Sequence, residues 1–161
     1  MTRIAVALLT LSLTGGAVMA KVDTPPEMGE RAKGSAKVVL ATVTDVEAAF
    51  GENAHGDRLI LSHVTMRVDE TMKGPHEAEV VVTLEGGTVG DLRLDVSDMP
   101  TLEKGRRAVL FLTSAPGGGY TPHGRGSGVV EVGPDNRAIG TNLTVEDIRA
   151  AVKAAAGKGN Q

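Results

Sequence analysis

The chain contains no cysteine and no tryptophan, and its 161 residues include only three aromatic rings, those of Phe50, Phe111 and Tyr120. Without cysteine it cannot form disulfides, thiolate metal sites or a cysteine nucleophile. It also lacks an excess of basic residues, because 17 Lys and Arg face 20 Asp and Glu, for a formal net charge of −3. A mildly acidic chain with so few rings disfavours nucleic-acid binding, which depends on positive charge and base stacking.

Long apolar runs are also scarce, and the longest one lies over residues 4–13, interrupted by Thr10 and Ser12. Arg3 precedes this run, and a small-residue stretch ending at Ala20 follows it, which is the order of a secretory signal peptide. A membrane anchor is the alternative, but it needs about 20 apolar residues. We therefore expect residues 1–20 to be a signal peptide and the protein to be exported, either periplasmic or secreted, with no membrane attachment after cleavage.

The remaining length predicts a single domain. Residues 21–35 form a polar lead-in, in which Thr24 and the prolines after it can begin a short helix that ends at Gly34; a mobile charged segment is the alternative. Residues 36–140 alternate β-branched runs with Gly and Pro turns and predict a β-barrel domain. Residues 141–161 predict a C-terminal helix with a frayed tail, because Thr144 and Asp147 suit a helix cap and an apolar stripe follows them.

Within the β domain, residues 58–71 place Ile60, Val64 and Met66 on one face and polar side chains on the other, as in a half-buried strand. Residues 107–113 are nearly all apolar and predict a central strand buried on both sides. Further strands are expected at 36–47, 79–84 and 88–96, with a short hairpin at 129–132 and 137–139. The predicted fold class is all-β, a small antiparallel barrel or sandwich.

The residues that could carry chemistry match no catalytic template. Ser127 lacks the glycines two positions before and after it that a nucleophile elbow requires. No two of the four histidines have the close spacing of a local metal half-site. His123, Arg125 and Tyr120 lie together near one turn and are the weak ligand-binding candidates. The sequence therefore predicts no catalytic residue, no metal and no cofactor.

Three strand segments carry a resemblance to a known family. Residues 36–43, 68–74 and 105–112 resemble strands of netrin-like modules, the OB-type barrels of tissue metalloproteinase inhibitors. The chain is more similar still to a set of exported bacterial proteins, often encoded beside matrixin-type zinc proteases, which share 86–90, Met99-Pro100 and 103–105. The resemblance covers about 36–140. It implies an OB-like barrel and a protein partner, with a co-exported zinc metalloprotease as the partner it suggests.

One feature of the animal inhibitors is missing. They are held by disulfides and chelate the protease zinc through an N-terminal cysteine, whereas the exported form of this chain would begin at Lys21 and has no cysteine. That inhibitory mechanism therefore does not carry over. We expect an exported, non-enzymatic binding module that presents loops 51–57, 85–90 and 115–125 to another protein. The alternative is an exported hydrolase with a dispersed site near His123 and Arg125. The partner's identity and the oligomeric state stay open.

Overall fold

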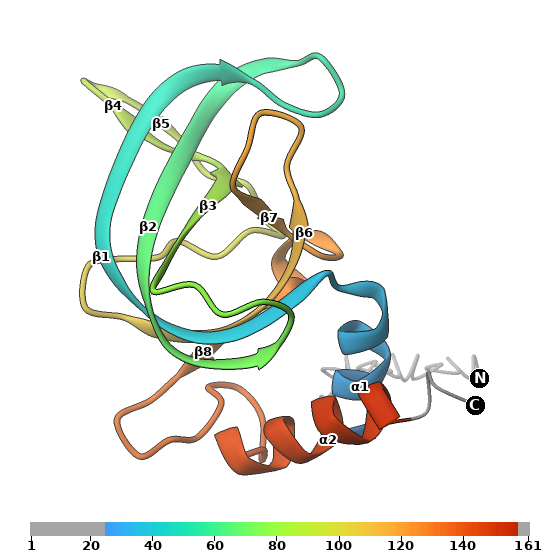
Figure 1. Cartoon of the computed structure of the whole chain (residues 1–161). Coiled ribbons are helices and arrows are strands. Elements are labelled where there is room, and N and C mark those ends of the chain that lie inside the picture. Colours follow the sequence, from blue (N-terminus) through green and yellow to red (C-terminus); the bar gives the residue numbers. More distant parts are fainter. Residues whose placement is uncertain (1–24, 158–161) are drawn as a thin grey trace, which may run out of the picture.

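A computed structural model describes residues 25–157 and has a mainly β architecture (Figure 1). A six-stranded mixed sheet curls into a nearly closed ring, with a short helix before it and a longer helix after it. The predicted signal peptide, residues 1–20, lies outside the described residues, as do 21–24 and 158–161.

Five strands make up the ring. β1 (Lys37–Glu52) pairs with β2 (Arg58–Lys73), and β2 pairs with β3 (Glu79–Glu85), both in antiparallel fashion. β6 (Arg107–Ser114) pairs with residues 37–42 of β1, and β7 (Tyr120–Pro122) lies between β6 and β3. A further strand, β8 (Val129–Val132), follows the short 3₁₀ helix η1 (Arg125–Gly128) and extends the sheet beyond β6.

The expectation of a purely antiparallel barrel is wrong at one point. β3 and β7 run parallel, where Val82 pairs with Tyr120. The reason is geometric: neighbouring strands that all alternate in direction cannot close a ring when their number is odd. With five strands in the ring, one parallel pair is required, and it is the shortest pairing in the sheet.

β6 is the central strand, as the apolar run predicted, because its residues 108–112 are all 0 % exposed. Its alternate side chains belong to two separate cores. Leu110 and Leu112 face the interior of the ring, whereas Val109 and Phe111 face the helices. The ring interior buries Val39, Ala41, Val43, Val64, Met66, Val80, Val82, Leu84, Leu102, Ala108, Leu110 and Leu112.

The second core lies between the sheet and the two helices, α1 (Pro25–Gly34) and α2 (Val145–Gly157). Met28 of α1 and Ile148 and Val152 of α2 pack there against Phe111. Lys73 at the end of β2 donates hydrogen bonds of 2.6 Å to the carbonyl oxygens of Ala32 and Ser35. This cation satisfies carbonyls at the C-terminal end of α1 and complements the helix dipole there.

The start of α2 is capped as the sequence predicted. The Thr144 Oγ1 accepts a hydrogen bond from the backbone N–H of Asp147, and the Asp147 carboxylate accepts one from the backbone N–H of Thr144. Arg149 of α2 then donates from Nε and Nη2 to the Glu70 carboxylate on β2, at 2.6 and 2.8 Å. The cap fixes where the helix begins, and the ion pair ties the helix to the sheet.

Two predicted strands differ in the structure. In place of one strand over 88–96, β4 (Gly87–Val89) and β5 (Leu92–Leu94) form a separate two-stranded hairpin. Gly86, just before the hairpin, and Gly87, its first residue, have φ values of +107° and +132°, which favour glycine, so the chain bends out of the main sheet there. The expected partner of β8 at 137–139 is reduced to a single bridge between Val132 and Ala138.

Candidate functional site

Loops that are far apart in the sequence surround one groove, with a volume of about 650 Å³, on the outer face of β2 and β3. We call it the loop groove. The turn between β1 and β2, the end of β3, and the segment between β6 and η1 each contribute to its lining. It is lined by Glu52, Asn53, Ala54, Leu61, His63, Val81, Thr83, Glu85, Met99, 115–119, Thr121, Pro122 and Arg125.

The floor of the loop groove is formed by side chains that alternate with the buried ones of β3. Val80, Val82 and Leu84 point into the core, so Val81, Thr83 and Glu85 point outward. Val81 is 39 % exposed, and Thr83 shares a 3.1 Å hydrogen bond between its Oγ1 and Nδ1 of His63 on β2. The floor therefore offers both an apolar contact and polar groups.

Arg125 lines the loop groove and pairs with two carboxylates. Its Nε donates to Asp98 Oδ2 at 2.5 Å, and its Nη2 donates to Glu85 Oε2 at 2.8 Å. The Arg125 hydrogen bond is the main reason that the pKa of Glu85 lies below its usual value, and Asn53, which donates to Glu85 at 3.0 Å, lowers it further. The pKa of Arg125 is raised in turn by Asp98 and Glu85. Arg125, Asp98 and Glu85 are thus paired with one another, and this network connects η1 to β3 and to the loop that carries Asp98.

Tyr120, the second candidate, belongs to another cluster. Its hydroxyl donates a 2.8 Å hydrogen bond to Glu77 Oε1, which also lies 3.2 Å from Nζ of Lys37. The Lys37 side chain is 1 % exposed, donates to the Pro75 carbonyl at 2.5 Å and lies 5.6 Å from the Tyr120 ring centroid. The pKa of Tyr120 is raised, first by burial and then by Glu77, whereas the Tyr120 hydrogen bond lowers the pKa of Glu77.

His123, the third candidate, is held by packing. Its backbone N–H donates to the Phe111 carbonyl at 2.7 Å, and its ring lies against Gly34 at the end of α1, where a β-carbon would clash with it. Within residues 25–157, the structure thus gives His123, Arg125 and Tyr120 three different sets of partners. Of the three, Arg125 alone lines the loop groove.

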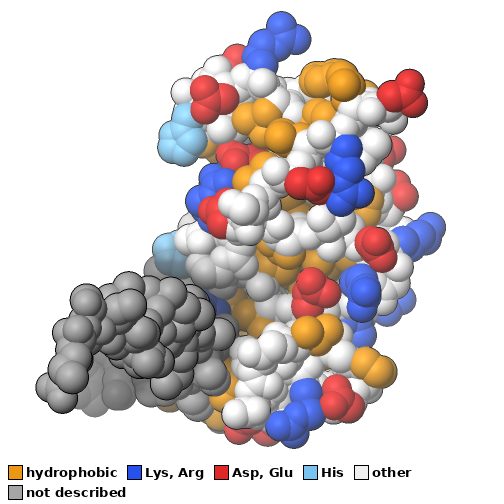
Figure 2. All heavy atoms as spheres, turned by 180° about the vertical axis from the view of Figure 1, so that it is seen from behind, with side chains coloured by type: hydrophobic (Ala, Val, Ile, Leu, Met, Phe, Trp, Pro, Cys, Tyr) orange, Lys and Arg blue, Asp and Glu red, His pale blue; other side chains and the backbone are white. Residues whose placement is uncertain are grey.

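The loop groove carries charges of both signs. The acidic side chains that line it are Glu52 and Glu85, and Arg125 is basic. The space-filling view in Figure 2 likewise shows acidic and basic side chains interspersed, with hydrophobic side chains between them. Over the part of the chain that the structure describes, no group of three or more His, Asp or Glu side chains could hold a metal ion. No described helix is long and apolar enough to cross a bilayer.

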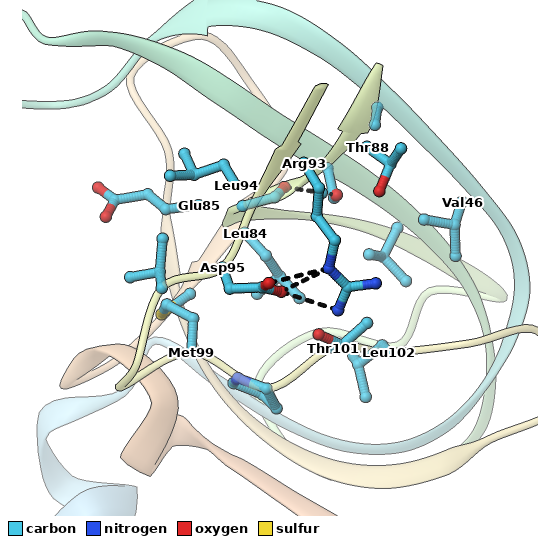
Figure 3. Close-up of a pocket in the computed structure, with 17 residues that line it drawn as sticks. Val46, Leu84, Glu85, Thr88, Arg93, Leu94, Asp95, Met99, Thr101 and Leu102 are labelled. Atoms are coloured by element: carbon cyan, nitrogen blue, oxygen red, sulfur yellow. Dashed lines mark hydrogen bonds and ion pairs between the residues drawn. The ribbon is translucent and has the colours of Figure 1, made fainter. Parts of the chain in front are cut away.

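A second, smaller cavity of about 340 Å³ lies beneath the β4–β5 hairpin (Figure 3). We call it the hairpin pocket. The inner faces of β1 and β2, the end of β3, the hairpin and residues 99–102 enclose it. Two hydrogen bonds to Gly86 hold the base of the hairpin on β2. The Ser62 Oγ donates to the Gly86 carbonyl at 2.7 Å, and the Gly86 N–H donates to the Ile60 carbonyl at 2.8 Å.

Sequence reasoning did not find the partners of Arg125 or the buried Lys37. Asp98 and Glu85 lie 27 and 40 positions before Arg125, so no local spacing joins them. The strand expected over 79–84 has Val81 and Thr83 on its outward face, but Glu85 was expected in the turn that follows, whereas β3 extends through it. No protein-family model matches the chain, and no curated protein is similar enough to it to indicate a family.

Proposed function

We propose that this protein is an exported, non-enzymatic binding module that engages another protein through the loop groove. The observation that carries the proposal is the convergence of 52–54, Glu85, 115–119 and Arg125 on one groove, because these segments are remote in sequence. Loops held on a rigid sheet are the usual place for binding residues. The export itself rests on the signal-peptide pattern of residues 1–20.

The strand order supports an OB-type barrel. Such barrels have five strands and bind ligands on the face of strands 2 and 3, between the loop that joins the first two strands and the loop before the last. In this chain the ring order is β1-β2-β3-β7-β6 and back to β1. The corresponding face and loops are the outer side of β2 and β3, residues 52–57 and residues 115–119, which meet at the loop groove.

The lining favours a protein over a nucleic acid or a hydrolysable substrate. Val81 offers an apolar contact, the carboxylates offer hydrogen-bond acceptors, and Arg125 offers donors. Such a mixture of apolar and polar groups is typical of protein interfaces. A nucleic acid would need a positive excess and stacking rings. A hydrolase would need His123 and Arg125 to converge on one carboxylate, and they have different partners. The resemblance to netrin-like modules makes a co-exported zinc metalloprotease the partner to test first.

Calorimetry of the form beginning at Lys21 with a co-exported zinc metalloprotease, taken from the neighbourhood of its gene where one is encoded there, tests the proposal. We expect binding that Val81→Asp weakens by roughly tenfold or more, since it places a charge in the apolar part of the interface. Val46→Asp is the matched control, because Val46 is 37 % exposed but lies outside the loop groove. Acetylation of the N-terminus alone, with lysine modification controlled, should leave binding unchanged.

Three results would count against this proposal. Absence of binding at roughly 100 μM removes the protease as partner, since specific interfaces of standard size bind far more tightly. Equal losses in Val81→Asp and Val46→Asp place the interface elsewhere. Loss of binding on N-terminal acetylation implicates the Lys21 amino group as a metal ligand.

A further inference from the structure

The hairpin pocket has the form of a small-molecule site that is distinct from the loop groove. Its volume of about 340 Å³ falls at the lower end of the range for ligand sites. Its cover, the β4–β5 hairpin, pairs with no strand of the main sheet and joins it through Gly86 and Gly87. The pocket therefore has a fixed floor and a separate cover.

The floor is apolar and belongs to the ring core. Val64, Leu84 and Leu102 line it and are at most 4 % exposed, so their side chains are held by packing on the far side. Val46 lines one side and is 37 % exposed. The exposed apolar surface of the pocket comes from Val46 and from the half-buried side chains of Leu94 and Met99, and an aliphatic chain inserted here would remove that surface from water.

The pocket also has charged groups in its lining, and these include the ion pair of Arg93 on β5 with Asp95, whose side chains are 63 % and 67 % exposed. Figure 3 shows the Arg93 guanidinium lying among Val46, Thr101 and Asp95, at the centre of the lining side chains. Its Nε donates to both carboxylate oxygens of Asp95 at 2.9 Å, and its Nη2 lies 2.8 Å from Oδ1. Among the described residues nothing pairs with Nη1, so Arg93 retains N–H donors for a ligand oxygen.

The charge of the pocket selects against an anionic ligand. Asp95 neutralises Arg93, and Glu85, the remaining charged lining residue, points away from Arg93 toward its own partner Arg125. A ligand carboxylate beside Arg93 would face the Asp95 carboxylate at short range, with no cation left unpaired. A neutral carbonyl oxygen can accept a hydrogen bond from Arg93 without that repulsion.

We propose that the hairpin pocket binds a small neutral molecule with a short aliphatic chain and one carbonyl oxygen, such as a short-chain ester or ketone. The chain lies against Val46, Leu94 and Met99, and the carbonyl oxygen accepts a hydrogen bond from Arg93. This site does not depend on the loop groove or on its protein partner.

Methyl hexanoate and hexanoate are the probes, because they share a chain and differ in charge. Titrations of the ¹⁵N-labelled form beginning at Lys21 should give a Kd of about 1 mM or tighter for methyl hexanoate, as expected for so small a ligand. Hexanoate should bind at least about tenfold more weakly. The shifted amides should be those of 84–88, 93–96 and 99–102.

Two substitutions test the role of the pocket and of Arg93. Val46→Trp fills the pocket and should abolish methyl hexanoate binding. Val81→Trp is the control and should leave binding unchanged, because Val81 is similarly exposed but lies in the loop groove. Thr88→Trp is the second filling variant if Val46→Trp does not fold. Arg93→Met should weaken methyl hexanoate binding by roughly tenfold and remove the preference for the ester.

The proposal is overturned if methyl hexanoate does not bind at about 1 mM, or if hexanoate binds as tightly as the ester. It is also overturned if the shifted amides lie on the outer face of β2 and β3, or if the folded filling variants bind as the unmodified protein does. A failure of protease binding at the loop groove would leave each of these measurements unaffected.

Discussion

Replacing Phe111 with alanine should lower the free energy of unfolding by about 3–5 kcal/mol, the range for a fully buried ring whose loss leaves a cavity. Phe111 is 0 % exposed and packs in the core beneath the helices with Met28, Ile148 and Val152. It lies on β6, which pairs with β1, β7 and β8, so the backbone around it cannot readily collapse into the space. We therefore expect a loss within the stated range rather than below it.

Urea denaturation followed by far-UV circular dichroism measures this loss. Phe50→Ala is the matched control, because Phe50 is 57 % exposed and its removal should change stability by less than about 0.5 kcal/mol. A loss below about 1 kcal/mol for Phe111→Ala would refute the reasoning, since that is the size of an average substitution. It would mean that the helices do not pack on β6 as described.

Three further substitutions test other contacts. Lys37→Met should cost about 1–3 kcal/mol in urea denaturation, because it leaves a carbonyl and a carboxylate without their buried donor; a neutral result would contradict the role of this lysine. Gly87→Ala should destabilise the hairpin, since φ is +132° and the added carbon meets the Ser62 hydroxyl, and hydrogen exchange at 87–94 should rise. Glu70→Gln should reduce stability at pH 7, and the loss should shrink as the pH falls below 4.5: the Arg149 hydrogen bond lowers the pKa of Glu70 in the folded state, so its contribution is present above the unfolded value of 4.5 and is lost as pH falls through the folded value. A difference between the two proteins that does not shrink on acidification would exclude that assignment.

The sequence predicted best those elements whose burial pattern is local. β6 was recognisable because residues 108–112 are all apolar, and β2 because buried and exposed side chains alternate along it. The start of α2 followed from Thr144 and Asp147, which are three residues apart and bond to each other. Each of these signals depends on near neighbours in the chain.

Features that depend on distant residues were not predictable in this way. β7 is three residues long, and its parallel pairing with β3 at Val82 follows from closing the ring rather than from its own sequence. The hairpin at 87–94 contains the expected apolar residues, but Leu92 is 60 % exposed because the two glycines before it turn the chain away from the sheet. Likewise, each loop that lines the loop groove was predicted from its own composition, whereas the groove itself forms only when the fold brings these loops together.

The core beneath the helices is assembled from both ends of the described chain. Met28 lies in the first helix and Val152 in the last, and both cover Val109 and Phe111 on the outer side of β6. A chain interrupted before Val145 would keep the ring interior but leave that outer side open to water, where exposed apolar surface promotes aggregation and chaperone binding. We infer that this outer face of β6 distinguishes an incomplete chain from a complete one, because it stays exposed until α2 has docked.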